Sequence, residues 1–285
     1  MIDRIKLREK NKIVVKIGTT SLTHTNGGMN FQRIEKLAKV LSDLRSNGKK
    51  IMLVTSGAIA AGAGKLGLKE RPEKLEEKQA LAAIGQAELI KIYEKSFANY
   101  SQIVAQVLIT KDGVFHPIRR LNAKNTLNTL MNMKIIPIIN ENDTVSTDEI
   151  EFGDNDTLSA HVSILAEADL LIILSDIDGL YNIDPRKDES ATMISKVIEI
   201  SNEIEEIAGS TGSHFAKGGM ATKISAAKLC DKAGIDTVIT SGEDPAVIFD
   251  VLDGKDVGTL FVAKKDFDLK EIDDRPPNLF KEKLG

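Results

Sequence analysis

Short apolar runs that alternate with longer helical patterns are the feature that most limits what this chain can fold into. The runs are rich in Val, Ile and Leu, and most of them lack the apolar–polar alternation of a half-exposed strand. Such runs are typical of strands that are buried on both faces of a parallel sheet. The pattern predicts six strands, at residues 12–17, 50–55, 102–109, 135–139, 170–174 and 237–240.

The segments between these runs have the periodicity of helices. Ile34, Leu37 and Leu41 share one face of a helix over residues 31–46, and the Asn-Gly pair that follows would end it. The predicted helices are residues 31–46, 75–98, 119–133, 156–167 and 220–232. Strands that alternate with helices predict an α/β fold, a three-layer αβα sandwich with a mostly parallel central sheet.

Charge and composition weaken several function classes. The 38 Lys and Arg residues against 42 Asp and Glu give a net charge of −4, and aromatic residues make up only 4% of the chain. Nucleic-acid and membrane-surface binding favour a basic surface, and recognition of single-stranded RNA favours stacking aromatics. We therefore expect neither a nucleic-acid nor a membrane partner.

The cysteine count and the start of the chain predict a cytoplasmic protein. Cys230 is the only cysteine, so no internal disulfide can form. The first residues lack the apolar stretch of a signal peptide, and no apolar run approaches the roughly 20 residues that span a bilayer.

In sheets of this type ligands bind beyond the carboxyl ends of the strands, so the strand exits are the candidates for chemistry. Lys16, Gly18 and Thr19 follow the first strand and would suit a phosphate, because Gly admits the backbone and Lys supplies charge. An ordinary turn with a surface lysine is the alternative. Ser56 and Gly57 follow the second strand within a run of small residues, which would suit an anion or close helix–sheet packing.

Two glycine motifs near the second strand are weak. Residues 62–67 have the letters of the dinucleotide fingerprint G-x-G-x-x-G, but they begin seven residues beyond Thr55 instead of at the strand end. Gly64 and Lys65 are also like part of a phosphate-binding P-loop, but Leu66 replaces its hydroxyl residue. We expect neither motif to bind a nucleotide.

Polar residues are dense after the fourth strand. Asn140 and Asp143 lie in an Asn-Glu-Asn-Asp run, and Asp154, Asn155 and Asp156 follow shortly after. These acidic groups could hold a cation, orient lysines or cap the next helix. Capping accounts for one acidic residue and leaves the others unexplained.

Two further exits suit a nucleotide. Ser175 and Asp176 follow the fifth strand, where the nearby Asp178–Gly179 pair would equally serve a plain turn. A glycine-rich loop then opens a helix, with a hydroxyl and lysines that suit a phosphate tail. A flexible loop is its alternative. Its candidate residues are Lys217, Gly218, Gly219, Met220, Ala221, Thr222 and Lys223.

No metal site is expected from the sequence. The four histidines are scattered, without metal-ligand spacing to one another or to the cysteine. His161 and Cys230 lie in predicted helices, and we expect both to be structural.

Together, five segments resemble the amino-acid kinase family. Each segment is weak alone, but all five in this order are highly specific, and the likeness extends from about residue 12 to about residue 264. The segments are Val-Val-Lys-Ile-Gly-Thr at 14–19, Thr-Ser-Gly-Ala-Ile-Ala-Ala-Gly at 55–62, Ile-Asn-Glu-Asn-Asp at 139–143, Phe-Gly-Asp-Asn-Asp at 152–156 and Gly-Gly-Met-Ala-Thr-Lys at 218–223.

Within the family, the segments are most similar to the branch that phosphorylates the side-chain carboxylate of L-glutamate. The resemblance implies transfer of the γ-phosphoryl group of ATP, with Mg²⁺, to give L-glutamyl 5-phosphate in proline biosynthesis. It implies that Lys16 and Lys223 contact ATP phosphates and that Asp156 holds both lysines. It also implies a glutamate site and a nucleotide site. The glutamate site would comprise Ser56, Gly57, Asn140, Asp143, Asp154 and Asn155. The nucleotide site would comprise Lys16, Gly18, Thr19, Ser175, Asp176 and the 217–223 loop.

The chemistry of the residues agrees with this activity. Carboxylate and triphosphate are both anions, and charge spreads over the phosphoryl oxygens in the transition state. Catalysis must then come from positioning and positive charge, which lysines supply. The γ-carboxylate is already ionised at neutral pH, so no general base is needed.

The resemblance also implies organisation and regulation. We expect a kinase domain over residues 1–264, a charged extension over 265–285, and the form of the enzyme without the C-terminal PUA domain that many members carry. Homo-oligomerisation, feedback inhibition by L-proline and hand-off to glutamate-5-semialdehyde dehydrogenase are expected as well. Two alternatives stay open: a kinase of N-acetylglutamate or aspartate, and a non-catalytic sensor of amino acids or nucleotides.

Overall fold

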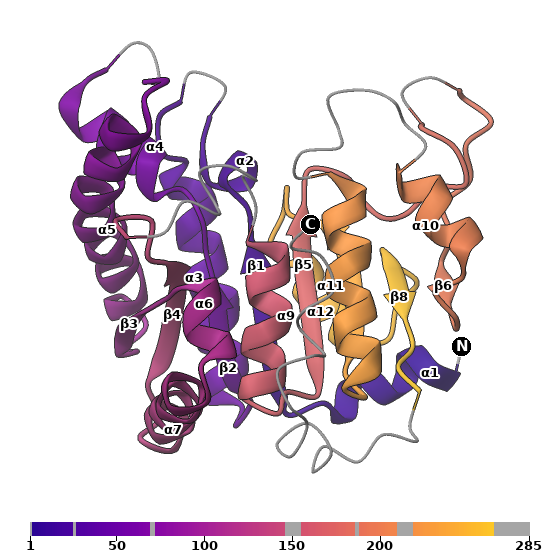
Figure 1. The fold of residues 1–285 in the computed structure, drawn as a ribbon. Coiled ribbons are helices and arrows are strands. Elements are labelled where there is room, and N and C mark those ends of the chain that lie inside the picture. Colours follow the sequence, from indigo (N-terminus) through magenta and orange to yellow (C-terminus); the bar gives the residue numbers. More distant parts are fainter. Residues whose placement is uncertain are drawn as a thin grey trace.

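A single sheet crosses the whole molecule (Figure 1). The computed structural model describes residues 2–24, 27–68, 72–145, 155–185, 188–209 and 219–264. Within these residues the sheet has eight strands in the order β3-β4-β2-β1-β5-β7-β8-β6. The strands are β1 (Lys12–Ile17), β2 (Lys50–Val54), β3 (Val104–Ile109), β4 (Ile136–Glu141), β5 (Leu170–Ser175), β6 (Lys196–Val197), β7 (Asp236–Ser241) and β8 (Thr259–Phe261).

The predicted sheet is confirmed in its strands and in their direction. All six predicted strands form, and they run parallel to one another. β8 pairs antiparallel with β7, and β6 pairs parallel with β8, so these two short strands run opposite to the other six. The sequence missed β6 and β8, which have two and three residues. Runs this short carry too little periodicity to be recognised.

The prediction that the strands are buried on both faces is confirmed for the central strands β4 and β5 but is wrong for β3. Every residue of β4 and β5 is buried, whereas only Ile109 is buried in β3. The physical reason is position, because β3 is the edge strand and has a neighbour, β4, on one side only.

Helices cover both faces of the sheet and create two cores. Ile13 and Val15 of β1 pack into one core with residues of α3, α5 and α12, while Val14 packs into the other with residues of α7, α9 and α11. This confirms the three-layer αβα sandwich. The helices of these layers are α3 (Phe31–Ser46), α5 (Leu75–Ala98), α12 (Val247–Leu252), α7 (Pro117–Asn132), α9 (Asp156–Leu165) and α11 (Met220–Lys232).

The predicted helices also form, with small shifts at their ends. The helix predicted from residue 119 begins at Pro117, because proline suits the first helical position. The shorter elements are α1 (Ile2–Ile5), η1 (Lys6–Glu9), α2 (Thr19–Leu22), α4 (Ala58–Leu66), α6 (Lys111–Phe115) and α10 (Asn202–Gly209).

The glycine motif at 62–67 has a packing role. Gly62 lies in α4, where an added Cβ would be 2.1 Å from the carbonyl oxygen of Leu81. Gly85 of α5 meets α4 in the same way, since its Cβ would be 1.7 Å from the carbonyl oxygen of Ala58. Gly62, the first glycine of the motif, therefore lets the two helices touch through their backbones.

Two further observations concern the chain as a whole. In the part of the chain that the structure describes, none of the helices has the length and apolar character needed to cross a bilayer. The predicted extension, residues 265–285, lies outside the described residues.

Candidate active site

The carboxyl ends of β1 and β5 are neighbours in the sheet, and the helices α9 and α11 begin near them (Figure 1). Lys16 is the fifth residue of β1, and Asp156 is the first residue of α9. The Nζ atom of Lys16 lies 2.6 Å from Oδ1 of Asp156, and both side chains are buried. This ion pair is thus buried at the carboxyl end of β1, in the middle of the sheet.

Lys223 approaches the same carboxylate from α11. Its Nζ lies 3.0 Å from Oδ2 of Asp156, and the hydroxyl of Thr222 lies 2.9 Å from that oxygen. Thr222 Oγ1 is also 2.8 Å from the carbonyl oxygen of Gly219, and its single proton can go to only one of the two acceptors at a time. Thr222 was expected at the nucleotide, whereas the contacts seen here hold Asp156.

The cluster of Lys16, Asp156 and Lys223 carries a net positive charge. Buried charges cost free energy unless they are paired and hydrogen-bonded. One carboxylate between two ammonium groups offsets that cost but leaves one positive charge in excess. The cluster is therefore suited to receive an anion.

A second group of polar side chains lies at the ends of β2 and β4. Nδ2 of Asn155 donates to the carbonyl oxygen of Thr55 at 2.7 Å and to Oδ1 of Asn140 at 2.8 Å. Both amide side chains are buried, and among the described residues Oδ1 of Asn155 and Nδ2 of Asn140 have no hydrogen-bond partner. Buried polar atoms of this kind are rare unless a ligand completes them.

Two carboxylates lie at the end of β4. Asp143 is 2% exposed, and Glu141 is fully buried. Burial, together with the negative charge of Glu141, raises the pKa of Asp143 to about 7. A cation placed here would relieve the penalty and return Asp143 to its ionised form. The sequence pattern does not distinguish Glu141 from its polar neighbours, because its burial depends on the packing of α5 against β4.

The loops after β1 and β2 face each other. Gly57 adopts φ 96°, and a Cβ there would lie 3.8 Å from Leu22 and 3.9 Å from Thr19. A Cβ on Gly18 would lie 3.4 Å from the Nζ of Lys16. Ser56 is buried beside this junction. The small residues therefore leave space next to the lysine head.

The predicted nucleotide residues lie at the end of β5, in the turn that follows it, and at the start of α11. Ser175 Oγ donates to Oδ1 of Asp176 at 3.0 Å, and the Ser175 carbonyl accepts from the N–H of Gly242 at 2.6 Å. Gly219 precedes α11, and its first turn begins with Met220 and Ala221. Asp154, Lys217 and Gly218 lie outside the described residues.

The histidine and cysteine expected to be structural are both buried. The ring of His161 contacts that of Phe115 edge-on, with centroids 5.5 Å apart. Burial raises the pKa of the Cys230 thiol to about 12. Within the described ranges no three His, Cys, Asp or Glu side chains gather as a metal site.

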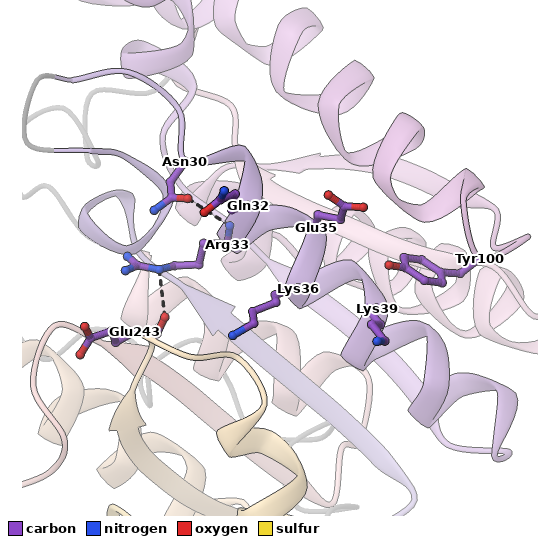
Figure 2. A pocket seen from close by; sticks show the side chains of 8 residues that line it. All are labelled: Asn30, Gln32, Arg33, Glu35, Lys36, Lys39, Tyr100 and Glu243. Carbon is purple, nitrogen blue, oxygen red and sulfur yellow. Dashed lines mark hydrogen bonds between the residues drawn. The ribbon is translucent and has the colours of Figure 1, made fainter.

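A surface hollow of about 470 Å³ lies beside α3 (Figure 2). Arg33 is one of its lining residues and donates to the carbonyl oxygens of Glu243 and Ser21. The hollow contains none of the predicted site residues. Its lining is Asn30, Gln32, Arg33, Glu35, Lys36, Lys39, Tyr100 and Glu243.

Comparison with known proteins gives one consistent result. The family model described as "Amino acid kinase family" matches residues 11–241. A glutamate 5-kinase of Clostridium perfringens is 53% identical over 266 residues, which cover 92% of this chain and 99% of that protein. Glutamate 5-kinases of Listeria innocua and Clostridium tetani are each 50% identical, covering 92% and 91% of this chain and 97% of their own length.

Solved structures support the fold. The carbamate kinase from Giardia lamblia bound to AMP-PNP has a TM-score of 0.63 at 17% identity, with 90% of this chain and all of that one covered. The UMP kinase from Bacillus anthracis has a TM-score of 0.58 at 18% identity, with 90% and 97% covered.

Proposed function

This chain belongs to the amino acid kinase family, and we propose that it is an ATP-dependent kinase of L-glutamate. In the reaction, a γ-carboxylate oxygen of glutamate forms a bond to the γ-phosphorus of ATP. The bond from that phosphorus to the bridging oxygen breaks, and ADP leaves with the electron pair. The products are L-glutamyl 5-phosphate and ADP, and this acyl phosphate is the first intermediate of proline biosynthesis.

The observation that carries the proposal is the Lys16–Asp156–Lys223 cluster. Two ammonium groups from different elements converge on one buried carboxylate, which fixes both of them before substrate arrives. Preorganised positive charge is what a phosphoryl transfer between two anions requires. We assign Lys16 and Lys223 to the phosphates on either side of the transferring group, and Asp156 to holding both lysines.

The polar group at β2 and β4 supports glutamate as the acceptor. Asp143 and Glu141 offer negative charge to an ammonium group. Asn140 and Asn155 each have an unsatisfied buried amide atom for the carboxylate or the ammonium of the substrate. Ser56 and Gly57, with Asp154, complete the proposed glutamate site. An N-acetyl group would remove the charge that the two carboxylates attract, so we propose a free amine.

The nucleotide is proposed to bind on the other side of the cluster. Ser175 contributes from the end of β5 and Asp176 from the turn that follows, and residues 217–223 contribute from the loop and first turn of α11. Gly18 and Thr19 line the phosphates from the β1 side. Asp156 already holds the lysines, Asp143 and Glu141 serve the proposed ammonium site, and among the described residues no three acidic, His or Cys side chains gather, so no protein cage for Mg²⁺ is assigned. Mg²⁺ would be held by the ATP phosphates and water, and would add positive charge there.

The proposed substrate is tested by assaying L-glutamate, N-acetyl-L-glutamate and L-aspartate in parallel with ATP. Trapping the product with hydroxylamine detects the acyl phosphate. We expect hydroxamate from glutamate, with kcat/KM for the other two acids lower by about 10²-fold or more, since each lacks an interaction of the site. A preference for either other acid would contradict the substrate, and no hydroxamate at all would favour a sensor.

Several finer properties belong to the same proposal. L-proline is proposed to compete at the glutamate site. A titration with proline at fixed glutamate tests this proposal, and activity that does not change with proline would refute it.

We also propose a homo-oligomer of two or four chains, a cytoplasmic location, and hand-off of the labile product to glutamate-5-semialdehyde dehydrogenase. Light scattering on the purified protein measures the oligomer.

A further inference from the structure

A buried hydroxyl joins the turn after β5 to the far edge of the sheet. Thr259, the first residue of β8, is fully buried. Its Oγ1 accepts from the backbone N–H of Leu180 at 2.8 Å and donates to the carbonyl oxygen of Ile194 at 2.7 Å. The N–H of Ile194 donates in turn to the carbonyl oxygen of Leu180 at 2.7 Å. Three segments distant in sequence are thus closed into one ring of hydrogen bonds.

The turn after β5 packs closely against this ring at Gly179, where no larger residue fits. A Cβ on Gly179 would lie 2.8 Å from Oγ1 of Thr259 and 2.8 Å from Sδ of Met193. The other end of the turn is held by the N–H of Gly242, which donates to the Ser175 carbonyl. The turn that carries Asp176 is therefore held between the end of β5 at Ser175 and the ring at Thr259.

Arg4 fastens the ring to the rest of the molecule. Its Nη2 atom donates to the carbonyl oxygens of Ser195 and Gly258, both at 2.7 Å, and the side chain is buried. These two residues are the chain neighbours of Ile194 and Thr259. A planar guanidinium with several hydrogen bonds holds its partners in a fixed geometry. The ring is consequently a rigid support for the turn.

We propose that Thr259 is a positioning residue for the nucleotide, because its hydroxyl sets the place of the turn that begins directly after Ser175 and carries Asp176. This inference rests on the proposed function, which assigns those two residues to ATP. Without the hydroxyl, the Leu180 N–H and the Ile194 carbonyl are buried with no partner, and a buried unsatisfied group costs more than the bond itself contributed. The turn must then move, and Asp176 moves with it relative to Ser175 at the end of β5.

The test compares Thr259→Val, which keeps the shape and loses the hydroxyl, with Thr259→Ser, which keeps the hydroxyl. We expect Thr259→Val to raise KM for ATP about 5- to 20-fold and to leave KM for glutamate within about 2-fold. Thr259→Ser should restore KM for ATP to within about 3-fold of the native value. Thr237→Val is the matched control, since Thr237 is also buried but lies at the opposite end of the adjacent strand β7, and it should leave both KM values unchanged.

A binding measurement separates this inference from the proposed function. Calorimetric titration with AMP-PNP, a non-hydrolysable ATP analogue, should show the same 5- to 20-fold weakening in Thr259→Val. If the native protein binds the analogue but forms no acyl phosphate from glutamate, the proposed function fails while the role of Thr259 is still measured. Equal affinities in the native protein and Thr259→Val, equal rises in both KM values, or the same effect in Thr237→Val would overturn the inference.

Gly179→Ala probes the same contact from the turn if Thr259→Val does not fold. Its added Cβ would meet Oγ1 of Thr259 and Sδ of Met193 and push the turn away. We expect weaker analogue binding in this variant also. Native affinity in folded Gly179→Ala would contradict the idea that the turn must sit against Thr259.

Discussion

Asp156 connects the two lysines on which the proposed chemistry depends. It is fully buried, and its two carboxylate oxygens each face one ammonium group. The two lysines lie on β1 and α11, which are far apart in the sequence, so local chain geometry does not set the distance between their ammonium groups. A buried carboxylate that accepts from both is a simple physical way to fix two positive charges a short distance apart.

Replacing Lys223 by alanine should reduce the rate far more than it weakens glutamate binding. We expect kcat to fall about 10²- to 10³-fold while KM for glutamate rises less than about 3-fold, because the ammonium acts mainly on charge that develops in the transition state. Steady-state kinetics on the folded variant measures both values. The matched control is Lys228→Ala, an exposed lysine of the same helix that pairs with Glu205. An unchanged kcat in Lys223→Ala would remove this lysine from catalysis.

Glutamate binding should depend on pH through Asp143. The pKa of this carboxyl is raised to about 7, and only its ionised form attracts the substrate ammonium. We expect KM for glutamate to rise about tenfold for each pH unit below 7 and to level off above it. Asp143→Asn should show a high KM that is independent of pH in this range. A native KM that stays flat from pH 5 to 8 would contradict the role of Asp143.

The buried carboxyl of Asp143 should also lower the stability of the folded protein at high pH. Folding raises the pKa of Asp143 above its unfolded value of 3.8, so between these values the folded state binds the extra proton. The native protein therefore loses stability as pH rises toward 7. We expect Asp143→Asn to melt at a higher temperature than the native protein, with a larger difference at pH 8 than at pH 5. Thermal denaturation monitored by circular dichroism measures it, and a difference that is the same at both pH values would count against this account.

At the scale of elements, the contact between α4 and α5 is set by two glycines. Gly62 and Gly85 bring the helix backbones so close that no Cβ fits at either position. The first of them belongs to a motif whose letters suggested a nucleotide site, and only the packing shows what it does. Behind this pair, α5 also supplies Gln86, which donates to the carbonyl oxygen of Glu141 and supports the end of β4.

Alanine substitutions at glycines of α4 and α5 should show whether close packing or helix propensity decides the free energy of unfolding. Gly85→Ala is expected to lower the free energy of unfolding by about 3 kcal/mol or more, because the helices must move apart. Gly64→Ala is the matched control, since Gly64 lies in α4 with no atom within 4 Å of an added Cβ. There we expect a gain of about 0.5–1 kcal/mol from the better helix former. Urea denaturation measures both, and equal effects at the two positions would contradict the close packing.

At the scale of the whole molecule, the strand order decides where the two proposed sites lie. β1 lies between β2 and β5, with β4 beyond β2 and β7 beyond β5. The proposed glutamate residues follow β2 and β4, and the proposed nucleotide residues follow β5. The Lys16–Asp156–Lys223 cluster lies between them, which is where the transferring phosphoryl group would pass.

Removing the central negative charge should make stability depend on ATP. Asp156→Asn leaves two buried ammonium groups without their carboxylate, and we expect the free energy of unfolding to fall by about 3–5 kcal/mol. The phosphates of ATP supply negative charge, so ATP should raise the melting temperature of this variant more than that of the native protein. Asp244→Asn, at an exposed pair with Lys36, is the control and should show the native shift. Equal ATP shifts in Asp156→Asn and the native protein would contradict the proposed placement of the phosphates.

The sequence alone determined the six longer strands, five of the helices and the candidate residues of the site. Continuous apolar runs predicted the six longer strands, because a strand buried on both faces needs apolar residues at every position. The residues at the strand exits could be named because parallel strands place their carboxyl ends at one edge of the sheet. Asp156 was named as the partner of both lysines only through the resemblance to a family.

Only the tertiary structure decided which of these residues meet. The edge position of β3, the burial of Glu141 beside Asp143, and the link from Arg4 through Thr259 to the turn after β5 leave no periodic signal in the sequence. The physical reason is that local patterns record how each residue suits its own strand or helix. Contacts between distant segments instead arise from how the layers pack, and they depend on the whole chain.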